Sequence, residues 1–224
     1  MGLGQFVGRL LLSVMRDAVQ KGETKDAILD AADRMLARHG YRKMTIDGLA
    51  AEVGIGKGTI YLHFSSKEEI VLSHIDRIIE RLKSRLSLIA ARDLSCEERL
   101  RSMLIERVMF RFDSVQHYTT SLNDLLTEIR PRLLVRRKLY FQEEARIFAS
   151  VIQEVSCSTT MIGIDPLELA KTILSATNSL LPFSLSTSEL GERAAIKRKA
   201  GQIADLLLTG LIRRQDDHAG PVIE

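Results

Sequence analysis

The 224-residue sequence contains no tryptophan, two cysteines and four prolines, and aromatic residues make up only 5% of it. The cysteine count excludes a disulfide scaffold, and the small number of prolines excludes a collagen-like chain. Hydrophobic residues account for 45% and charged residues for 27%, which excludes a disordered polyampholyte and provides enough apolar material for a core. The net charge is only +3, so the chain is not a strongly basic nucleic-acid coat.

The two cysteines, Cys96 and Cys157, lie far apart and match no metal-ligand or redox-motif spacing. We interpret them as reduced thiols of a cytoplasmic protein, with a redox-sensing pair as the alternative. The N-terminus lacks a basic segment before its apolar run and a small-residue cleavage site, which argues against a signal peptide. The longest uncharged stretch, Thr172 to Ser188, is too short and polar to span a bilayer. We therefore expect a cytoplasmic protein with no membrane partner.

Apolar residues recur with helical spacing along most of the chain, whereas the alternation typical of strands is nearly absent. The predicted fold class is all-α, with three short helices followed by six longer ones. The short helices are expected over about residues 24–39, 45–53 and 57–64. The longer helices are expected over about residues 66–89, 95–108, 122–129, 131–152, 165–181 and 189–212. Pro131 is placed where it could start the fourth of these.

Several of these helices carry local start or stop signals. Thr45 is a suitable N-cap for the second helix, and Gly54 is suited to end it. Ser-x-x-Glu capping boxes occur at residues 65–69 and 95–98. Residues 165–168 combine an aspartate cap, a proline at the first helical position and a glutamate at the third. These signals predict the positions of helix ends more firmly than periodicity alone.

The segment from Met44 to Lys67, MTIDGLAAEVGIGKGTIYLHFSSK, carries the clearest functional pattern. It predicts a helix, a tight turn containing Gly54, and a second helix that is too short to be stable alone. This second helix has one apolar side, formed by Ile60 and Phe64, and one outer, mostly polar side. Such a division suits a recognition helix that lies in the major groove of DNA.

Seven residues in this segment are candidate DNA contacts: Thr45, Lys57, Gly58, Thr59, Tyr61, His63 and Lys67. Lys57 can reach a phosphate or guanine, Gly58 permits close approach, and Thr59 can offer a hydroxyl or a methyl group. Tyr61 and His63 can donate hydrogen bonds to phosphate oxygens. The remaining two lie at helix N-termini, where backbone N–H groups also attract phosphate. Any one of these residues alone is more often simply solvated, so the prediction depends on their joint pattern.

This joint pattern resembles the DNA-binding domain of TetR-family transcriptional regulators. The resemblance covers about residues 22–82, with GKGTIYLHFSSKEEI as its most specific part. It implies a three-helix DNA-binding head with a helix-turn-helix at about residues 45–64. It also implies a six-helix ligand-binding and dimerisation domain over residues 83–213, a homodimer, and a palindromic operator on double-stranded DNA. Residues 1–21 depart from the family pattern, and residues 214–224 are expected to form a tail.

We expect residues 1–21 to be flexible or to precede the true start, with an ordered extra helix as the alternative. The last two helices are apolar on more than one face, which agrees with the implied dimer interface. The dimer candidates are Leu174, Leu181, Ile203, Leu207 and Leu211. Methionine and aromatic side chains of the middle helices can line an adaptable pocket, with ordinary core packing as the alternative. The ligand candidates are Met103, Phe110, Tyr140, Phe141 and Phe148.

A basic cluster surrounds Pro131, and we interpret it as solvated helix faces, with contact to an acidic ligand or phosphate as the alternative. It consists of Arg130, Arg132, Arg136, Arg137 and Lys138. The sequence has no nucleophile motif, metal-ligand set, phosphate loop or paired carboxylates, so we expect no catalysis, no cofactor and no metal. The predicted function is a ligand-responsive, homodimeric transcriptional repressor with an unidentified apolar effector. The alternative is a helical ligand-binding or protein-interaction dimer with little sequence-specific DNA binding.

The charge is unevenly distributed along the chain. Between Arg38 and Lys67 there are five basic and two acidic residues, whereas the rest of the sequence contains 27 of each. This distribution predicts a basic head on an electrically balanced body, as a protein that docks on DNA by one end needs.

Overall fold

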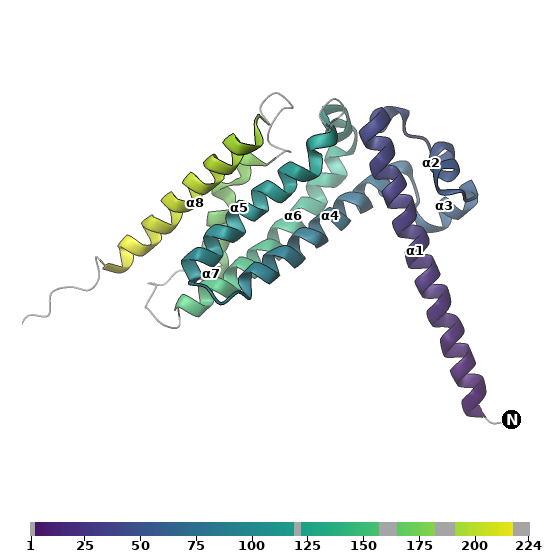
Figure 1. The fold of residues 1–224 in the computed structure, drawn as a ribbon, viewed down its shortest axis with the longest axis horizontal. Coiled ribbons are helices and arrows are strands. Elements are labelled where there is room, and N and C mark those ends of the chain that lie inside the picture. Colours follow the sequence, from purple (N-terminus) through teal and green to yellow (C-terminus); the bar gives the residue numbers. More distant parts are fainter. Residues whose placement is uncertain (1–2, 119–121, 157–164, 182–190, 217–224) are drawn as a thin grey trace, which may run out of the picture. The chain divides into compact units, whose positions relative to one another are not determined.

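A computed structural model describes the backbone of residues 3–118, 122–156, 165–181 and 191–216, with described side chains falling within residues 19–209. These residues form eight α-helices and two short 3₁₀ helices (Figure 1), so the all-α fold class is confirmed for the described part of the chain. The chain divides into two compact units, residues 1–75 and 76–224, with the division inside α4 (Lys67–Ala90). Within the described ranges, no helix combines the length and apolar character that a membrane span requires.

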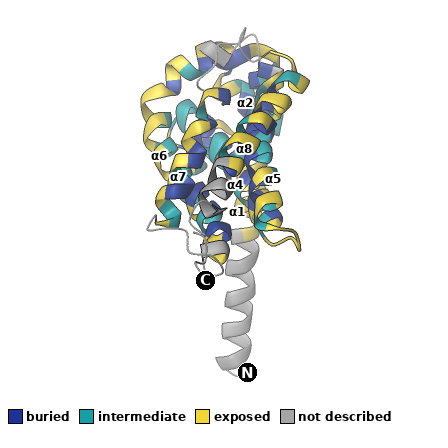
Figure 2. Cartoon of the chain, turned by 90° about the vertical axis from the view of Figure 1, so that its left-hand side faces the viewer, coloured by how far each residue is buried: buried dark blue, intermediate teal, exposed yellow. Residues whose placement is uncertain are grey.

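The first unit contains α1 (Leu3–Lys43), α2 (Ile46–Val53), α3 (Lys57–His63) and the start of α4. Over residues 19–75, buried positions (dark blue in Figure 2) recur along the helices because apolar residues return every three or four positions. The fully buried side chains include Ile28, Leu36, Met44, Leu49 and Ile60. The core of the unit is therefore built from the apolar faces that the periodicity predicted.

In place of the expected flexible N-terminal extension, α1 begins at Leu3. Thr24, where a helix was predicted to start, lies inside α1, and its hydroxyl donates to the carbonyl oxygen of Gln20 at 2.9 Å. Extending an existing helix needs no new nucleation, and residues 9–21 contain neither proline nor glycine. The predicted stop at Gly40 is a break in the helix, since its φ of 75° and ψ of 170° are non-helical.

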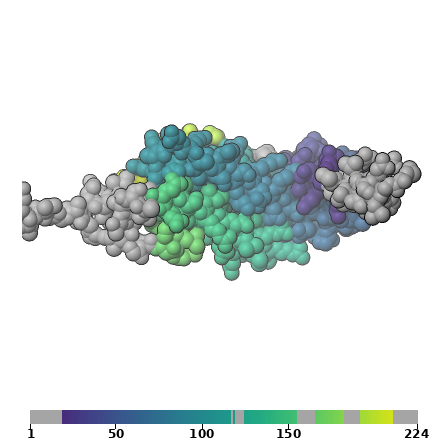
Figure 3. Space-filling view, turned by 90° about the horizontal axis from the view of Figure 1, so that it is seen from below, coloured from purple at the N-terminus to yellow at the C-terminus, as the bar shows by residue number. Residues whose placement is uncertain are grey.

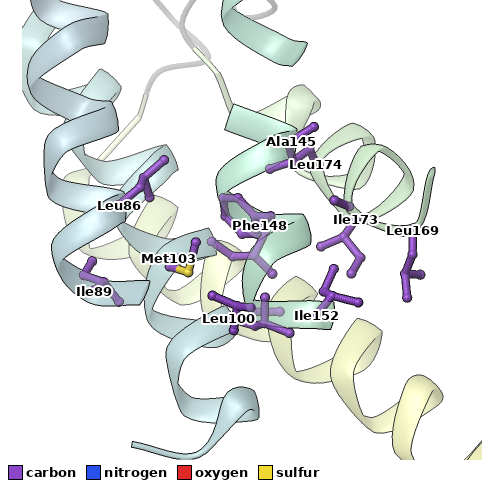
Figure 4. Close-up of a cluster of buried hydrophobic side chains, with 14 of the residues drawn as sticks. Leu86, Ile89, Leu100, Met103, Ala145, Phe148, Ile152, Leu169, Ile173 and Leu174 are labelled. Carbon is purple, nitrogen blue, oxygen red and sulfur yellow. The ribbon is translucent and has the colours of Figure 1, made fainter. Parts of the chain in front are cut away.

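The second unit contains the rest of α4, α5 (Cys96–Val115), η1 (Gln116–Tyr118), α6 (Leu122–Ser156), α7 (Pro166–Ala176), η2 (Asn178–Leu180) and α8 (Arg193–Asp216). The helix α6 packs against α5 and α7, and α5 also packs against α8. Teal and green segments of these helices lie together on the face shown in Figure 3. In the core, the Phe148 ring lies among apolar side chains from α4, α5 and α7 (Figure 4), including Leu86, Met103 and Leu174.

Two arginine–aspartate pairs join α5 to α8. Arg101 donates from Nε and Nη2 to the two carboxylate oxygens of Asp205, at 2.6 and 3.1 Å. Arg193 donates in the same way to Asp113, at 2.7 and 2.8 Å. Between these pairs, Gly201 is buried close to α5, and a Cβ at this position would lie 3.5 Å from Nη2 of Arg101. Small residues thus let the two helices approach closely between two bidentate ion pairs.

Three of the predicted helix starts are confirmed by their capping hydrogen bonds. The Ser95 hydroxyl accepts from the Glu98 amide at 3.2 Å, and the Glu98 carboxylate accepts from the Ser95 amide at 3.1 Å. The Ser66 hydroxyl accepts from the Glu69 amide at 3.1 Å. The Asp165 carboxylate accepts from the Glu168 amide, also at 3.1 Å. These caps each satisfy a backbone donor that the helix itself leaves unpaired.

The helices predicted over residues 122–129 and 131–152 are one helix, α6, with Pro131 inside it. Proline removes one backbone donor from a helix, but buried residues on both sides of it, Leu125 and Ile129 before and Phe148 after, pack into the unit. Tertiary packing therefore holds the helix through the proline. The six longer helices of the prediction are consequently five, α4 to α8.

Other differences concern the ends of α5, α7 and α8. The helix α5 continues to Val115, seven residues beyond the predicted end near residue 108. The helix α7 ends at Ala176 and not near residue 181, because Thr177 turns the chain. The Thr177 hydroxyl donates to the Leu174 carbonyl at 3.0 Å, and η2 follows directly. The helix α8 begins at Arg193 and continues to Asp216, four residues later at each end than predicted.

Candidate nucleic-acid interface

The turn between α2 and α3 has the local geometry that the sequence predicted. The Thr45 hydroxyl caps α2 by accepting from the Gly48 amide at 3.0 Å. Gly54 ends α2 in the left-handed conformation, with φ 75° and ψ 32°, and its amide donates to the Ala50 carbonyl at 2.9 Å. A side chain in this conformation costs about 1–2 kcal/mol. The predicted need for glycine at the turn is therefore confirmed.

The helix α3 has one buried and one exposed side. Ile60 is fully buried and holds α3 to the first unit, whereas Tyr61 is 50% and Leu62 79% exposed. Lys57 and Gly58 are also exposed, and a Cβ added at Gly58 would meet no heavy atom within 4 Å. Thr59 and His63, by contrast, are half-buried. The outer side of α3 thus offers solvent a short surface of mixed polar and apolar character.

Lys57 is held in place by a residue of α2. Its Nζ donates to Oδ2 of Asp47 at 3.1 Å and lies 3.1 Å from Oδ1. This hydrogen bond and the carboxylate charge raise the pKa of Lys57 above its ordinary value. Both side chains are solvent-exposed, so the pair is weak and Lys57 can exchange Asp47 for a phosphate.

Thr45 and Lys67 both make internal contacts in addition to their predicted role. The Thr45 hydroxyl oxygen accepts the capping bond, which leaves its hydrogen available to donate to a phosphate. Lys67 donates from Nζ to the Tyr41 carbonyl at 3.0 Å, and this nitrogen lies 4.1 Å from the centre of the Tyr41 ring. Lys67 thereby ties the start of α4 to the end of α1, and its contact with phosphate stays a prediction.

His63 is half-buried near the end of α3. Burial lowers its pKa, and the positive charges of Lys21 and Lys25 lower it further. The imidazole is therefore neutral at pH 7, with one N–H left to donate. A neutral imidazole fits the predicted hydrogen bond to phosphate, although it adds no charge.

Two residues of this surface were missed from the sequence. Leu62 is the most exposed large hydrophobic residue of α3, and it lies one helical turn after Gly58 on the same side. Its position on the outer side of a short helix was the available signal. Asp47 gave no such signal, because its pairing with Lys57 depends on how α2 and α3 cross.

The five ligand candidates of the second unit differ in their environment. Met103 and Phe148 are fully buried in the core, which is the ordinary packing named as the alternative. Phe110 and Phe141 are only partly buried and pack against that core. The Tyr140 hydroxyl is engaged by the carboxylate of Asp76. Burial and this carboxylate raise the pKa of Tyr140.

The dimer candidates are also divided by the structure. Leu174 and Leu181 are fully buried within the chain itself, so neither presents surface to a second copy. Ile203 and Leu207 on α8 are half-buried, and Leu211 lies outside the described side chains. Leu206, which was not among the candidates, is 75% exposed. Among the described residues of α8, Leu206 is thus the exposed large hydrophobic residue, and α6 also exposes Leu134, Val135 and Leu139.

The structure also places the cysteines and the basic cluster that the sequence singled out. Cys96 is half-buried, burial raises its pKa, and Cys157 lies outside the described residues. In the basic cluster, Arg136 donates to Asp76, and the interpretation as solvated faces fits the exposed residues Arg130, Arg132 and Lys138. No three or more His, Cys, Asp or Glu side chains within the described ranges are placed to hold a metal ion.

Residues 28–73, which include the helix-turn-helix, match the family described as "Bacterial regulatory proteins, tetR family". A curated relative is the HTH-type transcriptional regulator EthR of Mycolicibacterium smegmatis, 39% identical over 70 residues, or 31% of this chain and 32% of that protein. The matched segments span only 18–32% of the length of the first three curated relatives.

Solved structures resemble a larger part of the chain. A transcriptional regulator from Cytophaga hutchinsonii has a TM-score of 0.68 at 19% identity, covering 83% of this chain and 96% of that one. The complex of SmeT with triclosan has a TM-score of 0.60 at 18% identity, covering 84% and 91%. These likenesses show the fold. The sequence matches show that residues 28–73, which contain the helix-turn-helix, are similar to the corresponding segment of TetR-family regulators.

Proposed function

We propose that this protein is a DNA-binding transcriptional regulator that acts as a ligand-responsive, homodimeric repressor. The observation that carries the proposal is the two-sided character of α3, anchored by the buried Ile60. Its outer side exposes a cation, a hydroxyl donor, an apolar group and a glycine, namely Lys57, Tyr61, Leu62 and Gly58. This combination can contact phosphate, base edges and the thymine methyl group in a major groove. We propose no enzymatic activity, and a cytoplasmic location follows from the role on DNA.

The surface of α8 supports a dimer. Leu206 is exposed and Ile203 is half-buried, while Ala200 and Ala204 are buried and the half-buried Leu207 packs at the edge of the core. A second copy is an economical cover for this apolar strip. Two-fold symmetry would present two recognition helices to two half-sites of a palindrome.

An effector that binds the second unit would favour a conformation with lower affinity for DNA, and so release the operator. SmeT, which shares the fold, was solved as a complex with triclosan, and this supports the proposal of a small-molecule effector. The response to ligand is a separate part of the proposal, since DNA binding does not require it.

Selection of bound sequences from random double-stranded DNA tests the proposal with the full-length protein. We expect one palindromic sequence to be enriched, and we expect Lys57→Ala and Tyr61→Phe to weaken binding to it in a gel shift. Lys57→Ala removes one lysine–phosphate contact in each half-site, so it should also lower the salt dependence of dimer binding by about two units of slope. Lys197→Ala, at an exposed lysine of α8, is the matched control and should bind as wild type.

Enrichment of no sequence, with weak and salt-sensitive binding to all DNA, would instead support a helical ligand-binding or interaction dimer. Equal binding by wild type and the two α3 variants would contradict the assignment of the surface.

A further inference from the structure

A charged cluster lies in the second unit where α5, α6 and α7 meet. It contains Arg107, Arg111 and Glu144, whose side chains are 2%, 10% and 1% exposed. Nε of Arg107 donates to Oε2 of Glu144 at 2.7 Å, and Nη2 of Arg111 donates to Oε1. One carboxylate is thus shared by two guanidinium groups.

All other acceptors described for the two arginines are neutral. Nη1 of Arg107 donates to the Thr177 hydroxyl at 2.7 Å and to the Leu174 carbonyl at 3.2 Å. Its Nη2 donates to the Asn178 side-chain oxygen at 3.0 Å. Nη1 of Arg111 donates to the Arg107 carbonyl at 3.3 Å. The cluster therefore carries one more positive than negative charge.

Both kinds of charge persist at neutral pH. Burial lowers the pKa of Arg107 to about 10, with contributions from the positive charges of Arg111 and Arg137, so Arg107 stays protonated. Burial alone would raise the pKa of Glu144, but Arg111 and Arg107 more than offset this and hold it below its usual value. An excess positive charge at a buried position is unfavourable unless an anion balances it.

Besides these polar partners the cluster has apolar neighbours along α5 and α6, and its most exposed member is Arg111. Phe148, one turn after Glu144 on α6, and Met103, one turn before Arg107 on α5, belong to the packed core. Phe141, about one turn before Glu144, is only partly buried against that core. Arg111 keeps a tenth of its side-chain surface exposed, so an anion can approach from its side.

We propose that Arg111, supported by Arg107, binds the anionic group of an amphipathic effector whose apolar body contacts Phe141. This inference rests on the proposed function, because it names the chemical class of the effector. It replaces the wholly apolar effector of the sequence prediction with a monoanion carried on an apolar body. The planar guanidinium fork favours carboxylate, sulfonate or phosphate ester groups, which accept two parallel hydrogen bonds.

Two fluorescent probes that differ in one anionic group provide the test with the full-length protein. They are 8-anilinonaphthalene-1-sulfonate and its neutral counterpart, N-phenyl-1-naphthylamine. Arg111→Met leaves Arg107 paired with Glu144, so the fold should persist, which thermal unfolding verifies. We expect this variant to bind the sulfonate at least about tenfold more weakly than wild type, because the sulfonate loses a buried charge partner. We expect its affinity for the neutral probe to stay within about twofold of wild type.

Two further variants make the result specific. Arg111→Lys keeps the charge but not the fork, and should lose less sulfonate affinity than Arg111→Met. Arg146→Met, at an exposed arginine of the same unit, should change neither affinity. Unchanged sulfonate binding by Arg111→Met, or equal loss of both probes, would overturn the inference.

The same proteins are assayed on DNA, so that the two proposals fail separately. If wild type binds DNA but Arg111→Met does not change the affinity for the sulfonate, the anion site is refuted and the proposed DNA-binding function stands. If sulfonate binding depends on Arg111 but the protein selects no DNA sequence, the proposed DNA-binding function is refuted and the anion site stands.

Discussion

Gly54 and Gly58 lie four residues apart in the helix-turn-helix and provide a matched pair of glycine-to-alanine substitutions. At both positions an added Cβ would meet no heavy atom within 4 Å, so contacts with neighbours do not distinguish them. The backbone does, because Gly54 is left-handed with φ 75° and Gly58 lies inside α3. The two variants therefore isolate the effect of backbone conformation.

The expected magnitudes follow from these conformations. In Gly54→Ala, the left-handed alanine costs about 1–2 kcal/mol, partly offset by about 0.4–1 kcal/mol from the stiffer unfolded chain. A net loss of about 1 kcal/mol in the free energy of unfolding is expected. In Gly58→Ala, alanine favours the helix over glycine by about 0.5–1 kcal/mol. The two variants should thus differ by about 2 kcal/mol in stability.

Urea unfolding followed by far-UV circular dichroism measures these changes. Because the chain has two units, the transition of the first unit is identified by hydrogen exchange of the α2 amides. A gel shift on the selected operator adds the functional readout. Gly58→Ala should weaken DNA binding while raising stability, since its methyl group occupies the exposed side of α3. Gly54→Ala should bind nearly as wild type under conditions where it is folded.

The reasoning is refuted if both variants change stability in the same direction. Wild-type DNA affinity in Gly58→Ala would separately show that this face of α3 does not approach DNA closely.

Three further predictions concern charge. Asp47→Asn removes the carboxylate partner of Lys57 and a charge that repels DNA. Because a homodimer carries the change twice, gel shifts across salt concentrations should show tighter binding and a slope steeper by about two units; an unchanged slope would contradict this. Glu144→Gln removes the carboxylate that pairs with two buried guanidinium groups, so it should lower the free energy of unfolding by about 3–5 kcal/mol. The control, Gln142→Ala at an exposed position of the same helix, should leave this free energy unchanged. His63 has a lowered pKa in the free protein, and nearby phosphate raises it, so DNA binding takes up a proton. Affinity should rise as the pH falls toward the pKa that His63 has in the complex, and His63→Gln should remove that rise.

Features that depend on a few neighbouring residues could be predicted from the sequence. The cap at Thr45, the left-handed Gly54 and the capping box at Ser95 each involve groups within four residues of one another. The two sides of α3 follow from helical periodicity in the same way. The helix-turn-helix and its orientation of Ile60 were therefore accessible before the structure was known.

Features that depend on contacts between distant residues could not be predicted. Lys67 bonds to the carbonyl of Tyr41, 26 positions earlier, and Arg107 pairs with Glu144, 37 positions later. Periodicity says which face of a helix is buried but not what it meets. Similarly, Pro131 signals a helix start locally, and only the packing on both sides of it shows that α6 continues.

The two ion pairs between α5 and α8 specify the direction in which the last helix docks. On α5 the arginine Arg101 precedes Asp113, and on α8 the arginine Arg193 precedes Asp205 by the same number of residues. Antiparallel docking matches each arginine with an aspartate. Parallel docking would place arginine against arginine and aspartate against aspartate, and a slip of one turn would break both pairs together. The charge order thus selects against misdocked arrangements that the small apolar residues of α8 alone would tolerate.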